Sequence, residues 1–348
     1  MQNNFGGDKM AKVITLGEIM MRLSPPGNER FIQAGSFDIN FGGGEANVAV
    51  SLANYGHRAE FVTKIPDNPI GECAASALRK YGVGTEHIVR GGERLGIYFL
   101  ENGSAIRASN VVYDRANSAI SKANPNEFDF DAIFKDADWF HFTGITPALS
   151  DSAEALVEAA CKAAKRHGVT VSCDVNYRKK LWAEQKAKSV MSALMQYVDV
   201  CIDGDRILGF NPKGMDFSLG VPTVDEYKKI FSNMAKEYGF KYVAASMRVP
   251  KSASDNLWSA CIYCAEDNEI YHSTQYRFHP ITDRVGGGDS FVGGLICGLL
   301  DGKNYKDALE FGAAATALKH TIPGDVNLAT RSEVESIARG NSSGSVQR

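Results

Sequence analysis

The segment Asp283-Arg284-Val285-Gly286-Gly287-Gly288-Asp289-Ser290-Phe291 leads into an apolar run that continues to Leu299. Three consecutive glycines before a helix let the backbone turn sharply and expose several N–H groups. With the helix N-terminus, these groups form a site suited to an anion, above all a phosphoryl group. Asp289 lies in the first predicted helical turn, where its carboxylate can accept a proton from an attacking hydroxyl. The segment therefore predicts a phosphoryl-transfer site with Asp289 as its base.

An isolated aspartate at a helix start more often caps the helix. The three glycines, the second aspartate at Asp283 and the long apolar helix favour the catalytic interpretation of Asp289. Spacing argues against two other glycine-rich sites, because the chain has no GxxxxGK[ST] and its glycine clusters do not read GxGxxG. A P-loop and a dinucleotide-binding turn are therefore disfavoured.

A second glycine cluster, Gly42-Gly43-Gly44, also precedes a predicted helix and is followed by Asn47. Small residues allow a polyol to approach closely, and an asparagine side chain both donates and accepts hydrogen bonds. Gly43, Gly44 and Asn47 are therefore candidate sugar-binding residues. A plain helix start after a loop explains this cluster equally well.

Most of the chain alternates short β-rich runs with helical runs. Strands are predicted at 13–18, 59–65, 139–143, 170–175, 198–202 and 242–246, and helices at 44–55, 69–81, 151–167, 183–196 and 223–238. Strands that precede helices of roughly 10–15 residues indicate a parallel sheet. We expect an α/β fold with a doubly wound, mostly parallel sheet and helices on both of its faces.

Two stretches, about 20–41 and 94–115, show strand-like alternation without an intervening helix. They predict a small antiparallel β flap, or lid, with a hairpin turn at Glu101-Asn102-Gly103. We expect one domain over 11–340 with this lid inserted in it, and disordered ends at 1–10 and 341–348. Because a projecting sheet buries little by itself, we expect the lid to pack against its equivalent in a homodimer.

Composition and charge exclude several classes of protein. The 348 residues are 44% hydrophobic and 23% charged, which is typical of globular proteins. The net charge of −3 argues against a nucleic-acid or membrane-surface binder. No apolar run reaches the ~18–20 residues of a membrane span, and Met1–Met10 lacks the apolar core of a signal peptide. Seven cysteines, an odd number, favour reduced thiols and a cytoplasmic location, with Cys261 and Cys264 as structural thiols in a strand.

The segments Gly42–Gly56 and Asp283–Leu295 resemble the two signature regions of the ribokinase-like (PfkB) carbohydrate kinases. The order of elements between them extends the resemblance over about 11–330. Within the family, the chain is most similar to kinases of 2-keto-3-deoxygluconate, through Tyr113-Asp114-Arg115, Asp174-Val175-Asn176-Tyr177-Arg178 and Ile322-Pro323-Gly324-Asp325. The resemblance implies transfer of the γ-phosphoryl group of ATP to a sugar hydroxyl, with Mg²⁺.

The resemblance also implies roles for individual residues. Asp289 would be the base, and the amides of Gly286, Gly287 and Gly288 the anion hole. The implied substrate-binding residues are Gly43, Gly44, Asn47, Tyr98, Tyr113, Arg115, Arg178, Asp325 and Asp289. The implied nucleotide-binding residues are Gly286, Gly288, Asn176, Ser246 and Arg248.

The metal ligands depart from the family pattern. The family commonly carries an Asn-x-x-Glu motif after the strand at 198–202, whereas this chain reads Asp203-Gly204-Asp205-Arg206. Either Asp203 or Asp205 can substitute, or Mg²⁺ can rest on water and phosphate oxygens. The family also often uses a monovalent cation near the anion-hole loop. Asp283 and Val285 lie in that region, and Val285 offers only its backbone carbonyl.

Three arginines, Arg107, Arg115 and Arg178, favour an acidic sugar, because a guanidinium binds a carboxylate through paired hydrogen bonds. A neutral hexose would leave such charges without a partner. Arg107 is better explained as a solvated strand residue, so the argument rests on Arg115 and Arg178. The alternatives are a neutral-sugar kinase of the fructokinase or ribokinase type and a sugar-binding sensor without catalysis. A nicotinamide oxidoreductase is disfavoured because it would need a dinucleotide-binding motif.

Overall fold

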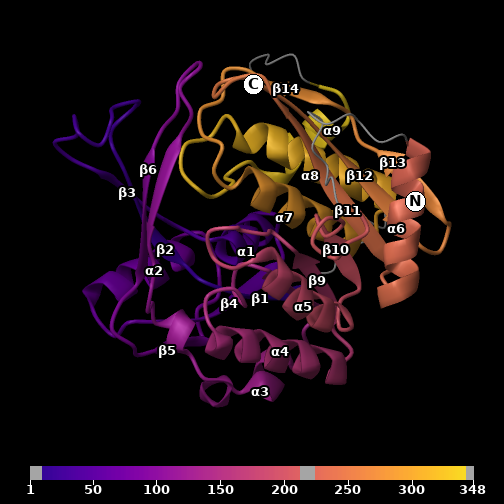
Figure 1. Ribbon diagram of the computed structural model, residues 1–348, viewed down its shortest axis with the longest axis horizontal. Coiled ribbons are helices and arrows are strands. Elements are labelled where there is room, and N and C mark those ends of the chain that lie inside the picture. Colours follow the sequence, from indigo (N-terminus) through magenta and orange to yellow (C-terminus); the bar gives the residue numbers. More distant parts are fainter. Residues whose placement is uncertain (1–9, 212–223, 342–348) are drawn as a thin grey trace, which may run out of the picture.

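The computed structural model describes residues 10–211 and 224–341. Within them, ten strands form one sheet in the order β13-β12-β11-β10-β9-β8-β1-β4-β5, with β14 paired to β12 (Figure 1). The strands are β1 (Lys12–Leu16), β4 (Arg58–Ile65), β5 (Ile88–Arg90), β8 (Trp139–Thr143), β9 (Thr170–Asp174), β10 (Val200–Ile202), β11 (Tyr242–Pro250), β12 (Asn256–Cys264), β13 (Glu269–His272) and β14 (Tyr276–Phe278). Neighbouring strands from β5 to β11 are parallel, and β12 is antiparallel to its three partners.

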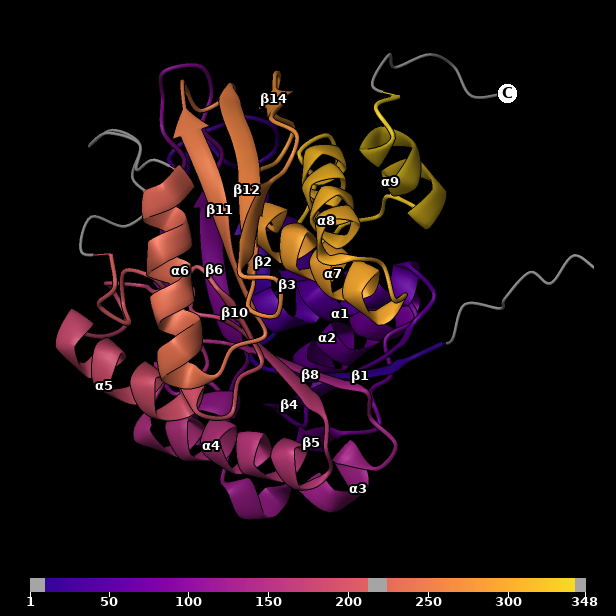
Figure 2. The same ribbon diagram turned by 90° about the vertical axis from the view of Figure 1, so that its right-hand side faces the viewer.

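Helices cover both faces of this sheet (Figure 2). One hydrophobic core lies under α1 (Gly44–Asn54), α2 (Pro69–Lys80), α7 (Gly287–Leu300), α8 (Tyr305–Lys319) and α9 (Arg331–Ala338). A second core lies under α3 (Phe130–Phe134), α4 (Asp151–Arg166), α5 (Glu184–Met195) and α6 (Val224–Tyr238). The central strands β1, β8, β9 and β10 are buried almost throughout, as strands covered on both faces must be. The predicted doubly wound, mostly parallel sheet is confirmed.

The first strand is shorter than the predicted 13–18. It ends at Leu16, and the chain leaves the main sheet at Gly17. A Cβ on Gly17 would lie 2.2 Å from the carboxylate of Glu45, which is buried beneath it. Glycine at this position therefore lets the start of α1 approach the end of β1.

The lid is a separate sheet in the order β3-β2-β6-β7. Its strands are β2 (Met20–Ser24), β3 (Asp38–Gly42), β6 (Gly96–Glu101) and β7 (Asn110–Asp114). The outer pairs are antiparallel, and the central pair, β2 with β6, is parallel. Figure 1 shows these strands rising to one side of the main sheet.

The predicted hairpin turn at Glu101-Asn102-Gly103 is wrong. β6 and β7 do pair, but the connection runs over 102–109 and reverses between Ser104 and Arg107, whose backbones exchange hydrogen bonds of 2.9 and 2.8 Å. Ala105 provides the left-handed residue of this turn, with φ of 50°. The reversal therefore lies beyond the Asn-Gly pair.

Three other expectations concern the ends of the chain, the thiols and membrane-spanning helices. The tails predicted at 1–10 and 341–348 lie outside the described residues, apart from Met10 and Asn341. Six of the seven cysteines are buried and Cys73 is exposed, and all are free thiols. Over the described ranges, no helix combines the length and the hydropathy that a membrane span requires.

Candidate active site

A cavity of about 1340 Å³ lies between the lid and the carboxyl ends of central strands such as β9. Ligands of doubly wound sheets bind at this edge. All the residues proposed above as base, anion hole, substrate ligands or nucleotide ligands line it: Gly43, Gly44, Asn47, Tyr98, Tyr113, Arg115, Asn176, Arg178, Ser246, Arg248, Gly286, Gly287, Gly288, Asp289 and Asp325. The fold therefore gathers candidate residues from both ends of the chain into one cavity.

Asp289 lies in the first turn of α7, whose N-cap is Gly286. Its carboxylate does not cap the helix, and Oδ2 instead accepts a hydrogen bond of 2.6 Å from Nδ2 of Asn47. Asn47 Oδ1 accepts from the amide of Gly43 at 3.3 Å, so the start of α1 holds the carboxylate in place. A Cβ on Gly44 would lie 3.7 Å from Asp289 Oδ1. Because Gly44 has no Cβ, the space beside the carboxylate is open to a substrate hydroxyl.

Asp289 is a stronger base than an ordinary aspartate. Burial raises the pKa of Asp289 to about 6, although the hydrogen bond from Asn47 and the charge of Arg178 lower it. A general base is most effective when its pKa approaches the working pH. The carboxylate is thus mostly ionised at neutral pH and still basic enough to accept a proton.

One of the three amides predicted to form the anion hole is already bonded within the chain. The amide of Gly287 donates to the carbonyl of Arg284 at 3.3 Å within the turn. The amides of Gly286, Gly288 and Asp289 have no hydrogen-bond acceptor in the described part of the chain. Gly286 adopts φ of 77°, a left-handed conformation that glycine allows without strain. The amides that remain free to bind an anion are therefore those of Gly286, Gly288 and Asp289. The amide of Asp289 replaces the amide of Gly287 in the predicted set.

Arg22, on the lid strand β2, is a residue that the sequence analysis missed. Its side chain is only 3% exposed, and its guanidinium donates to Asp325 and to Asp283, each at 2.8 Å. Asp325 also accepts from the hydroxyl of Tyr98, so two predicted sugar ligands bond to each other. Burial lowers the pKa of Arg22, but the charges of Asp325 and Asp283 outweigh this effect. The net pKa therefore lies above the ordinary value of an arginine. No sequence signal marks Arg22, because an arginine on a flap strand is usually solvated.

The argument for an acidic sugar from Arg115 and Arg178 is wrong for Arg115. Nε of Arg115 donates to Glu18 at 2.8 Å in a buried ion pair. Arg107 pairs with Glu101 at 3.1 Å and does not line the cavity. Arg178 is exposed in the cavity and forms no ion pair with a carboxylate in residues 10–211 and 224–341. Of these three arginines, Arg178 is therefore the one that can still pair with the carboxylate of an acidic substrate.

Two carboxylates lie at the ends of adjacent strands, where Asp174 ends β9 and Asp203 follows β10. Asp203 accepts hydrogen bonds from the amide and hydroxyl of Ser246, at 2.8 and 2.9 Å. Burial raises the pKa of Asp174, and the charge of Asp203 raises it further. Asp205 is buried and does not line the cavity. Of the two candidate metal ligands, Asp203 is therefore the one in the cavity, and Asp174, which the sequence analysis did not consider, lies beside it.

The predicted nucleotide ligands Ser246 and Arg248 lie on β11, where Arg248 is exposed. Arg284 also lines the cavity, and burial, followed by the charge of Arg248, lowers its pKa. Two neighbouring guanidinium groups suit the phosphates of a nucleotide. Arg284 belongs to the segment that opens the sequence analysis, but its proximity to Arg248 arises only in the folded chain.

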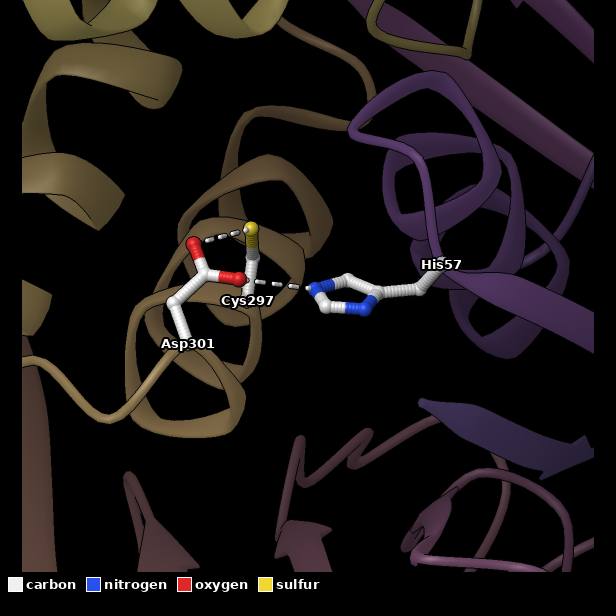
Figure 3. A group of neighbouring side chains, drawn as sticks. All are labelled: His57, Cys297 and Asp301. Atoms are coloured by element: carbon white, nitrogen blue, oxygen red, sulfur yellow. Dashed lines mark hydrogen bonds and ion pairs between the residues drawn. The ribbon is translucent and has the colours of Figure 1, made fainter. Parts of the chain in front are cut away.

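A second group of potential metal ligands, His57, Cys297 and Asp301, lies away from this cavity (Figure 3). Asp301 forms an ion pair with Arg331 at the start of α9 and approaches Nε2 of His57 at 3.5 Å. Nδ1 of His57 accepts a hydrogen bond of 3.4 Å from the amide of Ala11. The guanidinium of Arg331 already neutralises the carboxylate of Asp301. We therefore assign this group a structural role, in which it links α7 and α9 to the start of β4.

A basic carboxylate that lines the same cavity as unbonded amides and several arginines is the arrangement of a phosphoryl-transfer enzyme. A family model described as pfkB family carbohydrate kinase matches residues 10–243 and 258–330. The chain belongs to this family of carbohydrate kinases, and the resemblance drawn from the two glycine-rich segments is confirmed.

Three similar proteins cover nearly the whole chain. The 2-dehydro-3-deoxygalactonokinase of Haloferax volcanii is 34% identical over 336 residues, or 96% of this chain and 98% of the relative. A crystal structure of 2-dehydro-3-deoxygluconokinase from Thermotoga maritima has 48% identity and a TM-score of 0.90, covering 95% of this chain and 100% of that one. A structure of a putative ribokinase II from E. coli in complex with ATP and Mg²⁺ has 22% identity and a TM-score of 0.78, covering 95% and 99%, and it shares the fold.

Proposed function

We propose that the protein transfers the γ-phosphoryl group of ATP to a hydroxyl of a 2-keto-3-deoxy sugar acid, with 2-keto-3-deoxygluconate as the first candidate. One observation carries the proposal: a carboxylate with a raised pKa, Asp289, shares its cavity with the unpaired guanidinium of Arg178. The carboxylate supports proton abstraction, and the guanidinium supports binding of an acidic substrate. The names of the relatives from Haloferax volcanii and Thermotoga maritima, a galactonokinase and a gluconokinase of 2-dehydro-3-deoxy acids, agree with it.

In the proposed reaction, the substrate hydroxyl lies in the open space between Gly44 and Asp289. Its oxygen bonds to the γ-phosphorus while the bond from that phosphorus to the bridging oxygen of ADP breaks, and its proton passes to Asp289. The amides of Gly286 and Gly288 stabilise the negative charge on the transferred group. Positioning and electrostatics dominate such transfers, so few side chains are required.

ATP and Mg²⁺ are the proposed cofactors. Arg248 and Arg284 support binding of the nucleotide phosphates. Bound Mg²⁺ supplies positive charge to those phosphates, and Asp174 and Asp203 would hold it directly or through water. The charge of Asp203 disfavours ionisation of the buried Asp174, and a divalent cation between them would relieve this.

A neutral-sugar kinase is the second candidate. It is favoured by the ion pair of Arg115 with Glu18, because this pair leaves only Arg178 of the two arginines on which the argument for an acidic sugar rested. In this reading Arg178 binds the transferred phosphate and not a substrate carboxylate.

A coupled assay of ADP release distinguishes these candidates. The panel contains 2-keto-3-deoxygluconate, its galacto epimer, fructose and ribose, each with ATP and Mg²⁺. We expect kcat/KM to be at least ~10²-fold higher for a keto acid, because a charged partner of a cavity arginine is lost with a neutral sugar. A preference for fructose or ribose would overturn the sugar-acid assignment. Thermal stabilisation by a sugar without ADP release would instead support a sensor.

We also propose that 11–340 act as one domain whose lid, about 20–41 and 94–115, packs against its equivalent in a homodimer. Exposed apolar side chains on the lid support this, since Ile39 is 61% and Val112 is 47% exposed. Sedimentation velocity at micromolar concentration should then show a dimer, and a monomer throughout would contradict the proposal. The free thiols support a cytoplasmic location.

A further inference from the structure

The resemblance to the family implies a monovalent cation near the anion-hole loop, in the region of Asp283 and Val285. Both oxygen atoms of the Asp283 carboxylate already accept hydrogen bonds there. Its Oδ1 accepts from the amide of Val285 at 3.0 Å, and its Oδ2 accepts from the amide of Gly324 at 3.1 Å and from Arg22 at 2.8 Å. Asp283 is only 6% exposed in its side chain. The side-chain oxygens of Asp283 are therefore already bound to donors of the chain itself.

A second cation of the chain lies directly behind the same loop. Lys319, the last residue of α8, is fully buried, and its Nζ donates to the carbonyl of Ile322 at 2.9 Å. A Cβ placed on Gly286 would lie 3.4 Å from Cε of Lys319. The end of this side chain therefore contacts the back of the turn whose front faces the cavity.

The carboxylates in this region already have cations of the chain beside them. Arg22 forms ion pairs with both Asp283 and Asp325. Burial lowers the pKa of Lys319, while the charges of Asp283 and Asp325 raise it. The charge of Asp289 also raises the pKa of Lys319, so the two cations lie near three carboxylates. Arg22 and Lys319 therefore already supply positive charge of the chain itself beside the carboxylates that an added ion would neutralise.

We propose that Arg22 and Lys319 take the place of a monovalent cation, so that phosphoryl transfer proceeds without one. Lys319 is then a positioning residue, which fixes the Gly286 turn and adds positive charge behind the anion hole. Arg22 couples the same turn to the lid through Asp283. The inference rests on the kinase activity proposed above and specifies which cations serve it.

The first test uses the unmodified protein. Turnover is measured at constant ionic strength with K⁺, Na⁺, Cs⁺ or tetramethylammonium as the sole monovalent cation. We expect equal rates within about twofold, because screening depends on ionic strength and not on the identity of the ion. Activation of about tenfold or more by K⁺ over tetramethylammonium, well beyond a screening effect, would overturn the proposal.

The second test removes the ammonium. Lys319→Met keeps an unbranched side chain that is one atom shorter, and we expect kcat to fall roughly tenfold or more, since preorganised charge beside a developing anion contributes strongly to rate. Added K⁺ or ammonium should restore part of the loss, whereas a purely structural defect would not respond to either ion. Lys229→Met, which removes an exposed lysine on α6, is the matched control and should behave as the unmodified protein in every salt.

A third measurement does not depend on turnover or on the variant folding. Crystals of the unmodified protein grown with Rb⁺ should show no anomalous peak beside the Gly286 turn. A peak there would contradict the proposal. If no sugar is phosphorylated in any salt, the proposed function fails, while the Rb⁺ result still decides the charge arrangement.

Discussion

Replacement of Asp289 by asparagine is expected to lower kcat by at least ~10²-fold, a typical contribution of a general base. Asparagine keeps the size of the side chain and can still bond to Asn47, but it cannot accept the substrate proton. Because the unbonded amides of Gly286 and Gly288 are unchanged, ATP should bind with nearly unaltered affinity. The ADP-release assay measures the first effect, and calorimetric titration with ATP measures the second.

Asp205→Asn is the matched control, because Asp205 is also a buried aspartate but does not line the cavity. We expect it to retain turnover within about threefold, as substitutions outside the reacting site usually do. If Asp289→Asn turned over near the rate of the unmodified protein, Asp289 would not be the base.

The pH dependence follows from the same carboxylate. Burial, as the largest effect, raises the pKa of Asp289 to about 6, and only the deprotonated form can act as the base. Activity should therefore be lost as the pH falls through 6, with kcat/KM dropping about tenfold per pH unit below it. An aspartate with its ordinary pKa, about 3.9, would remain active to pH 5. A profile of kcat/KM between pH 5 and 8 separates the two, and a level profile would argue against the raised pKa.

Arg178→Ala is expected to lower kcat/KM by about 10²-fold for 2-keto-3-deoxygluconate, because the substrate carboxylate would lose its charged partner. For a neutral sugar such as fructose, the same substitution should change kcat/KM by no more than about threefold, since no charged partner is removed. The physical reason is that Arg178 forms no ion pair with a carboxylate of the described residues, although its charge acts on Asp174, Asp203 and Asp289. For each of the two sugars, kcat/KM of the variant is compared with that of the unmodified protein in the same ADP-release assay.

The control is Arg107→Ala, which removes a guanidinium already paired with Glu101 outside the cavity. This substitution should leave kcat/KM unchanged for both the acidic and the neutral sugar. Equal losses on acidic and neutral sugars from Arg178→Ala would show that this arginine serves the phosphates. No loss on either would place recognition of the acid elsewhere.

Much of the fold could be predicted because its determinants are local. Apolar runs such as 139–143 and 170–175 are strands because both of their faces are buried, and this pattern is visible in the residues themselves. The lid turn was misplaced because a left-handed residue at Ala105, which is uncommon for alanine, moved the reversal past the Asn-Gly pair.

By itself, the order of residues determined the α/β sheet, the glycine turn before α7 and the aspartate within the first turn of that helix, since each depends on neighbours in the chain. Tertiary structure alone decided which charges are paired. Arg115 meets Glu18, Arg22 meets Asp283 and Asp325, and Lys319 lies behind Gly286, through contacts between segments far apart in the sequence. An ion pair depends on the distance between two side chains in space, and a linear pattern carries no information on that distance.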